Sequence, residues 1–304
     1  MIEKQARMPL EIEFHADDYG LFPAQSERIL DCWEHGVLNG VSVMPNSPFL
    51  QTAMERLYVE KREMAVAVHL NIIEGKSLCS AGEVPLLVDE KGVFRVSFGG
   101  LLLHSFLPGR KSYREQLKKE ILAQIQAVMQ YLPEGTPLRL DGHAHYHMVP
   151  VMFDALMDVL KEEAWQISYI RIPREHLSLY LRHLGKLQDI SPINFAKVII
   201  LNLPARRNDH KYSHFLRSLE QRLFLGVFLS GRMTLPNVSA ILPDAMELAR
   251  KNQMDIELLS HPGGVFEDAD IEKLTSKDDL HFLTCDFRNK EGTMLKEIHK
   301  ENLK

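Results

Sequence analysis

The sequence predicts an α/β fold, a complete or incomplete TIM-barrel-like (β/α) barrel with about seven parallel strands. Short apolar segments alternate along the chain with longer helical segments, and connections of that length join parallel strands through right-handed crossovers. The number of strands favours a barrel over a Rossmann sheet. No Gly-x-Gly-x-x-Gly motif follows the first strand, which also argues against a dinucleotide-binding sheet.

The first part of the chain shows this alternation most simply. Leu10, Ile12 and Phe14 alternate with polar residues, which predicts a strand that ends at the turn of residues 17–20. Pro23 is favourable at the first position of a helix, and Gly36 is suited to its end. The elements predicted next are a strand at residues 37–44, a helix at 49–59 and a strand at 64–70.

Residues 71–111 interrupt the alternation, because this segment is rich in glycine, proline and serine. A connection of this length in a compact domain is usually functional. The segment begins directly after the third predicted strand, whose last polar residue is His69. We therefore expect the segment to border the mouth of the active site.

Regular elements return after residue 111. The apolar residues of the next segment recur at helical spacing, which predicts a helix there. The predicted order is a helix at residues 113–131, a strand at 137–141, a helix at 151–164, a strand at 168–172, a mixed region to 222, a strand at 225–229, a helix at 243–251 and a strand at 255–259. The charged residues after Asp286 are expected to form a solvated helix or a frayed end.

Length and composition are consistent with one large domain. The 304 residues are 45% hydrophobic, which is enough for a large core. We predict a single barrel domain over residues 1–288 and a charged tail over 289–304. The 41 acidic and 36 basic residues give a net charge of -5 and are interspersed, so nucleic acid is not an expected partner.

The ends and the cysteines indicate a cytoplasmic protein. The amino terminus is polar, and the apolar runs are too short for a membrane span. Cys32, Cys79 and Cys285 are widely spaced and form no Cys-x-x-Cys pair. This pattern fits reduced thiols better than a disulfide framework.

Five polar residues follow the ends of predicted strands: Asp17, Asp18, His69, His143 and His261. The carboxyl ends of parallel strands in a barrel share one face, and active sites are built on that face. Carboxylate and imidazole together suit a divalent ion, and three protein ligands leave a position open for water. With one of the two aspartates on the metal, the other is free to accept a proton from the bound water.

Each of these residues also has a structural interpretation. An Asp-Asp pair before Tyr-Gly is common in turns and helix caps, and a histidine in an apolar strand is often a hydrogen-bonded core residue. His261 stands alone before a Pro-Gly turn. The run Asp141-Gly142-His143-Ala144-His145-Tyr146-His147 is a stronger signal, because alternating histidines beside an aspartate rarely serve packing. His145 and His147 could contact substrate or support their neighbours.

The sequence resembles the YdjC-like carbohydrate deacetylases, a family that includes chitooligosaccharide deacetylase and a hopanoid-biosynthesis branch. Four segments carry the resemblance: residues 15–21 (His-Ala-Asp-Asp-Tyr-Gly-Leu), 68–75, 141–150 and 259–263. Two departures are that His15 replaces the usual Asn and that Gly142 stands where Ser or Thr is common. Residues 177–236 match poorly, and this region could shape the substrate pocket.

The resemblance implies a distorted (β/α) barrel, a metal site made by Asp18, His69 and His143, and Asp17 as the general base. One divalent ion, Mg²⁺ or Zn²⁺, would serve as cofactor, and the substrate would be a small N-acetylated carbohydrate that loses its acetyl group. His261 is the candidate general acid, because imidazole titrates near neutral pH. The oligomeric state, a homodimer included, stays open.

Two other functions compete with deacetylation. A metal-dependent phosphoesterase could use the same carboxylates and imidazoles, with Arg171 and Arg174 as a phosphate clamp. A sugar- or metal-binding protein could keep the site without turnover. The second aspartate argues against pure binding, because metal binding alone does not require it.

Overall fold

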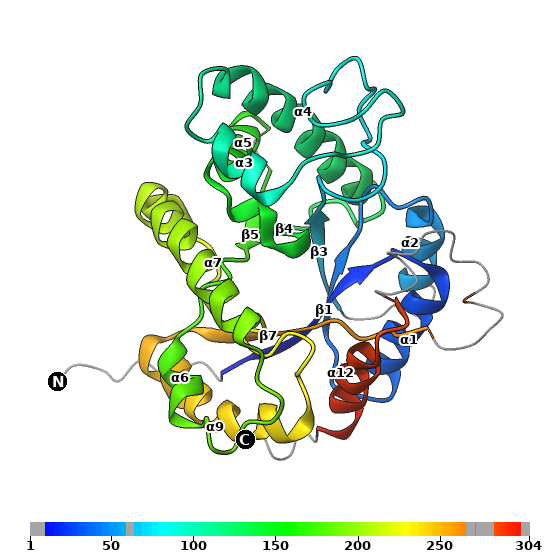
Figure 1. Cartoon of the computed structure of the whole chain (residues 1–304). Coiled ribbons are helices and arrows are strands. Elements are labelled where there is room, and N and C mark those ends of the chain that lie inside the picture. Colours follow the sequence, from blue (N-terminus) through cyan, green and yellow to red (C-terminus); the bar gives the residue numbers. More distant parts are fainter. Residues whose placement is uncertain (1–9, 59–63, 164, 266–270, 272–282, 299–304) are drawn as a thin grey trace.

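The computed structural model describes residues 10–58, 64–163, 165–265, 271 and 283–298, and its centre is a sheet of seven parallel strands (Figure 1). The strand order is β5-β4-β3-β2-β1-β7-β6. The strands are β1 (Ile12–Tyr19), β2 (Gly40–Val43), β3 (Ala65–Leu70), β4 (Leu138–Gly142), β5 (Ile167–Ile170), β6 (Arg222–Leu225) and β7 (Asp255–Ser260). The predicted α/β class and number of strands are confirmed.

The sheet curls into a half-barrel, with β5 and β6 as its two edge strands. A backbone hydrogen bond links the two edges: the Glu220 N–H donates to the Ser168 carbonyl at 2.9 Å. Neighbouring strands twist relative to one another, so a sheet of this width curls. The curl brings side chains from distant strands together in the interior.

Helices follow the strands, and most of them surround the sheet (Figure 1). The described residues form α1 (Pro23–Glu34), α2 (Leu50–Tyr58), α3 (Phe98–His104), α4 (Arg110–Met129), η1 (His143–Met148), α5 (Pro150–Glu162), α6 (Leu177–Arg182), α7 (Pro192–Lys211), α8 (Ser213–Leu216), α9 (Leu235–Asn252) and α12 (Asp286–Glu297). None of the helices in the described ranges is long and apolar enough to cross a membrane.

The sixth strand lies earlier than predicted. The prediction placed it at residues 225–229, but β6 ends at Leu225. Beyond that point the Glu175 carboxylate accepts the backbone N–H groups of Gly226, Val227 and Phe228, at 2.6, 3.1 and 2.8 Å. A side chain therefore satisfies the donors that a longer strand would have used in the sheet.

Two helical segments also differ from the prediction. The helix predicted from residue 243 begins at Leu235 and contains Pro243, because apolar residues on both sides of the proline are buried. The residues after Asp286, expected to be solvated or frayed, include α12, which packs against α1 and α9. Met294 and Leu295 of α12 are at most 1% exposed.

Candidate metal and catalytic site

The end of β1 is distorted in a way that turns two adjacent carboxylates into the barrel. The pairing of β1 with β2 shifts register between Ala16 and Tyr19. The backbone of Asp18 has φ 67°, a left-handed conformation that residues other than glycine seldom adopt. Adjacent strand residues normally point to opposite faces, but here Asp17 and Asp18 lie 3.9 and 3.5 Å from the same nitrogen, His69 Nε2.

Asp18, His69 and His143 form the cluster that the resemblance implied as a metal site. Their ligand atoms all lie within 4.8 Å of one another, and the three residues are buried. His69 Nε2 is a buried nitrogen that has no hydrogen-bond partner among the described residues. His69 Nδ1 lies 2.6 Å from Asp141 Oδ1, and a donated Nδ1–H leaves the Nε2 lone pair available. The donor set therefore fits a divalent ion.

The cluster strongly perturbs the titration of its members. Burial acts to lower the pKa of His69, but the charges of Asp17 and Asp141 outweigh burial and raise this pKa to about 10. For His143 the hydrogen bonds to Asp18 and Glu74 likewise outweigh burial, and its pKa is raised to about 9. Burial opposes ionisation of Asp18, yet its histidine partners hold its pKa well below the usual range. Protons and a metal ion compete for such nitrogens.

The three histidines of the run after β4 have different surroundings. His143 Nδ1 lies 3.0 Å from Asp18 Oδ1. Ala144 and His145 have positive φ angles, and the kinked turn directs His145 against the ring of Phe224. His147 Nε2 donates to the Arg171 carbonyl at 2.9 Å. Only His143 of the run belongs to the Asp18 cluster.

Gly142 is required by this turn. A Cβ at residue 142 would lie 2.8 Å from His147 Nδ1, which is closer than real Cβ contacts come. The departure from the family pattern at this position thus accompanies the inward placement of His147.

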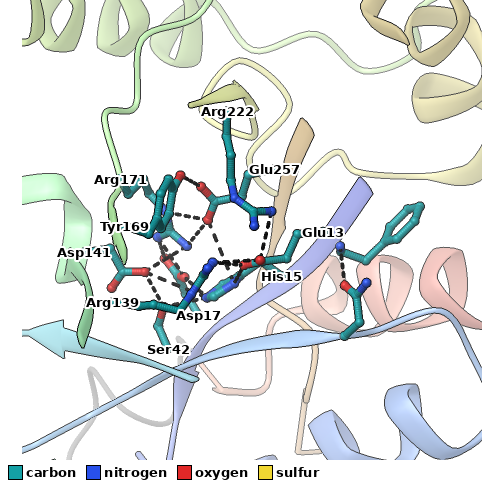
Figure 2. Close-up of polar contacts among 12 residues, drawn as sticks. Glu13, His15, Asp17, Ser42, Arg139, Asp141, Tyr169, Arg171, Arg222 and Glu257 are labelled. Atoms are coloured by element: carbon teal, nitrogen blue, oxygen red, sulfur yellow. Dashed lines mark hydrogen bonds and ion pairs between the residues drawn. The ribbon is translucent and has the colours of Figure 1, made fainter. Parts of the chain in front are cut away.

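Asp17 is held by an arginine that sequence reasoning did not connect to it (Figure 2). Arg171 Nη1 donates to both carboxylate oxygens of Asp17 at 2.9 Å. The same guanidinium contacts Asp141 Oδ2 at 2.9 Å and Glu257 Oε1 at 2.6 Å, and Arg171 is fully buried. The one feature of the sequence that could have indicated the role of Arg171 is its position directly after an apolar strand.

His15, the departure from the family's usual Asn, lies beside Asp17 in the same network, with its Nε2 3.8 Å from Asp17 Oδ1 (Figure 2). Its Nδ1 is 2.7 Å from Glu13 Oε1 and its Nε2 is 2.6 Å from Ser42 Oγ. The Ser42 hydroxyl in turn donates to Asp141. His15 also belongs to two further clusters whose ligand atoms are close enough together to hold a metal ion, one with Glu13 and Glu257 and one with Asp17 and Asp141. Arginine side chains already balance their carboxylates, because Arg139 and Arg222 contact Glu13 as Arg171 contacts Asp17 and Asp141.

α12 contributes two buried charged residues that the sequence did not reveal. Arg288 Nη2 donates to Asp18 Oδ2 at 2.9 Å. Glu291 accepts the backbone N–H of His261 at 2.5 Å and that of Gly231 at 2.7 Å. The charge-rich composition of this segment concealed the inward face of the helix.

A pocket of about 490 Å³ opens onto the cluster. Asp17, Asp18, His69, His143 and His261 all line it, so the structure brings together every predicted site residue. The other lining residues include Ile73, Glu74 and Phe98 from residues 71–111 and Lys197, Ile200 and Leu201 from α7. The expectation that residues 71–111 border the mouth is thereby met.

Known proteins resemble this chain along most of its length. The profile of the YdjC-like protein family matches residues 11–297. The carbohydrate deacetylase of Mus musculus is 25% identical over 252 residues, 82% of this chain and 76% of that protein. The Homo sapiens carbohydrate deacetylase is 24% identical over 273 residues, 85% of this chain and 76% of that protein.

Bacterial proteins match as well. The carbohydrate deacetylase of Geobacillus stearothermophilus is 27% identical over 169 residues, 56% of this chain and 63% of that protein. A solved structure from Enterococcus faecalis V583, described as a cellobiose-phosphate cleavage protein, superposes with a TM-score of 0.66 at 18% identity. It covers 96% of this chain and 92% of the other, and the likeness supports the fold.

Proposed function

The chain belongs to the YdjC-like family, and on that premise we propose that it is a carbohydrate deacetylase that hydrolyses the acetamide of an N-acetylated sugar with the help of one divalent metal ion. The observation that carries the proposal is the meeting of Asp18, His69 and His143 at the floor of one pocket, with Asp17 beside them. The carbohydrate deacetylase relatives support the substrate class.

Asp18, His69 and His143 would hold the ion. A divalent ion in such a site supplies a water of lowered pKa and stabilises negative charge on the acetyl oxygen. Asp141 supports this site through His69 Nδ1, and Arg288 supports it through the second oxygen of Asp18. These contacts keep the ligand atoms of His69 and Asp18 directed toward one point.

Asp17 would accept the proton of the attacking water. Its carboxylate lines the pocket, and Arg171 fixes its orientation through both oxygens. When the water attacks the acetyl carbon, its proton passes to Asp17 and the carbonyl becomes a tetrahedral oxyanion. The C–N bond then breaks and acetate leaves.

The amine of the sugar must receive a proton as the C–N bond breaks, and His261 is the candidate donor. Its side chain lines the pocket and is 28% exposed, so it can meet both substrate and solvent. Glu291 holds its backbone N–H at 2.5 Å and lies 3.7 Å from its Nδ1. Glu291 therefore helps to hold the loop that carries His261 beside the pocket.

The surroundings of the two arginines argue against the phosphoesterase alternative. Arg171 is fully buried and bound to carboxylates, so it cannot clamp a phosphate. Arg174 is absent from the described pocket lining and lies 3.7 Å from Asp209. Among the described residues that line the pocket, Lys197 is the single lysine or arginine. A phosphoryl group would need a denser set of positive charges.

Acetate release from a panel of N-acetylated sugars, measured on the metal-loaded protein, tests the proposal. We expect release that a chelator stops, and we expect His143→Ala to lose metal and activity together. His35→Ala, a change of an exposed histidine outside the pocket lining, should alter neither quantity. Hydrolysis of phosphate esters without acetate release would favour the phosphoesterase, and tight sugar binding without turnover would favour a binding protein.

A further inference from the structure

The large apolar side chains that are exposed in the described residues are concentrated in two segments. Eleven of the thirteen lie within residues 102–107 and 181–203, which we call the apolar rim. The three most exposed are Phe106 at 75%, Ile193 at 68% and Leu203 at 63%. Single exposed apolar residues need no explanation, but a gathering of this kind marks an interaction surface.

Both segments of the apolar rim adjoin the mouth of the active-site pocket. Phe98, the first residue of α3, lines the pocket, and so do Lys197 and Ile200 of α7. α3 and α7 both pack against α5. In the view of Figure 1, α3, α7 and α6 follow one another along the same side of the molecule.

The first part of α7 is apolar on all sides. Residues 192–205 contain a single charged residue, Lys197. The inner face buries Val198, Leu201 and Ala205, whereas Ile193 and Leu203 are exposed. A helix that is apolar all round is normally covered all round, so its outward face indicates a partner.

The apolar rim and the residues that flank it are basic within an acidic protein. Residues 98–114 contain three Lys and Arg residues and no acidic one, whereas 181–211 contain six basic and two acidic residues. Arg110, Lys111, Lys197 and Arg206 are exposed and make no ion pair with any residue the structure describes. The chain as a whole carries a net charge of -5. The partner that complements this face is therefore apolar and negatively charged.

We propose that the apolar rim docks the chain on an anionic lipid surface. Exposed apolar side chains flanked by lysine and arginine are the combination that binds peripheral proteins to the membrane interface. A second copy of the chain fits this face less well. A two-fold contact would set the basic residues of one rim against those of the other and cover both pocket mouths. The proposal goes beyond the deacetylase activity and does not depend on it.

Cosedimentation of the whole chain with lipid vesicles tests this docking. We expect binding to vesicles of phosphatidylcholine mixed with phosphatidylglycerol, little binding to phosphatidylcholine alone, and weaker binding as salt is added. The double variant Phe106→Ser, Leu203→Ser should bind about tenfold more weakly or worse, because two inserted side chains lose their apolar surface. Neither residue lines the described pocket.

A matched control is the pair Leu78→Ser, Leu86→Ser, which removes two exposed leucines, 42% and 45% exposed, outside the rim. This variant should bind vesicles as the unchanged protein does, and thermal unfolding should show that both variants fold. Absence of binding to the anionic vesicles, or equal loss in the two variants, would overturn the proposal. So would a dimer that dissociates in the rim variant without any vesicle binding, since the occupant would then be a second copy.

Discussion

Asp17 and Asp18 are neighbours in the sequence and contact different groups. Asp17 accepts from Arg171 through both oxygens, whereas Asp18 contacts His143 and Arg288. At the scale of the residue, this difference separates the carboxylate that we propose as the proton acceptor from the one directed at the histidine cluster. The left-handed φ of Asp18 is the local distortion that permits the separation.

The two aspartates should give different variants. Asp17→Asn is expected to keep its metal and lose about 100- to 10,000-fold in rate, since an amide cannot accept the proton. Asp18→Asn is expected to bind metal more weakly, because a neutral amide is a poorer ligand. Metal content and acetate release, measured on both variants, decide the assignment. If Asp17→Asn lost the ion and Asp18→Asn kept it, the roles would be reversed.

At the scale of the element, α12 stands out because it is the last element that the structure describes and yet contacts the end of the first strand. Arg288 is 4% exposed by its side chain and donates to Asp18, and Glu291 binds the backbone of the loops that carry His261 and Gly231. This helix therefore contributes to the candidate site. Some of its charged residues are buried against the site, and others face the solvent. Lys290, for comparison, is about half exposed and pairs with Asp286.

Replacement of Arg288 by methionine should weaken metal binding by about 10- to 100-fold, the usual cost of losing a group that supports a metal ligand. The physical reason is that one oxygen of Asp18 loses its donor, so the carboxylate is less well oriented. Lys290→Met on the same helix removes an exposed charge and should leave the affinity unchanged. Calorimetric titration with a divalent ion measures both. Equal affinities in the two variants would remove α12 from the metal site.

At the scale of the whole molecule, a charged network fills part of the barrel where apolar packing would be expected. Residues of β1, β4, β5 and β7 meet there, with Arg171 at the centre (Figure 2). Buried ion pairs need partners on every side, since removal of one leaves an uncompensated charge. His147, next to this network, is buried in its neutral form, and burial lowers its pKa to about 4.

The stability of the protein should therefore fall on acidification. His147 has its pKa lowered from 6.5 to about 4 by folding, so between these values the unfolded chain binds more protons. This group contributes stability that is complete above pH 6.5 and is lost toward pH 4, by about 3 kcal/mol at most. In the variant His147→Gln, the new side chain can still donate to the Arg171 carbonyl but does not titrate.

Denaturant unfolding at a series of pH values compares the unchanged protein with His147→Gln. The difference in free energy of unfolding between them should shrink from pH 6.5 to pH 4. His35→Gln, at an exposed histidine, serves as the control and should run parallel to the unchanged protein. A parallel curve for His147→Gln as well would show that this histidine does not couple folding to pH.

The sequence by itself determined the fold class, most strand positions and the residues at the strand ends. Periodicity reports burial locally, and polar residues after apolar strands stand out against it. The polar partners were decided by tertiary structure alone. Arg171 and Asp17 are 154 residues apart, and Arg288 and Asp18 are 270 apart, so no local pattern joins them. The end of β6 was likewise decided by Glu175, because its carboxylate accepts hydrogen bonds from the backbone N–H groups of Gly226 and Phe228.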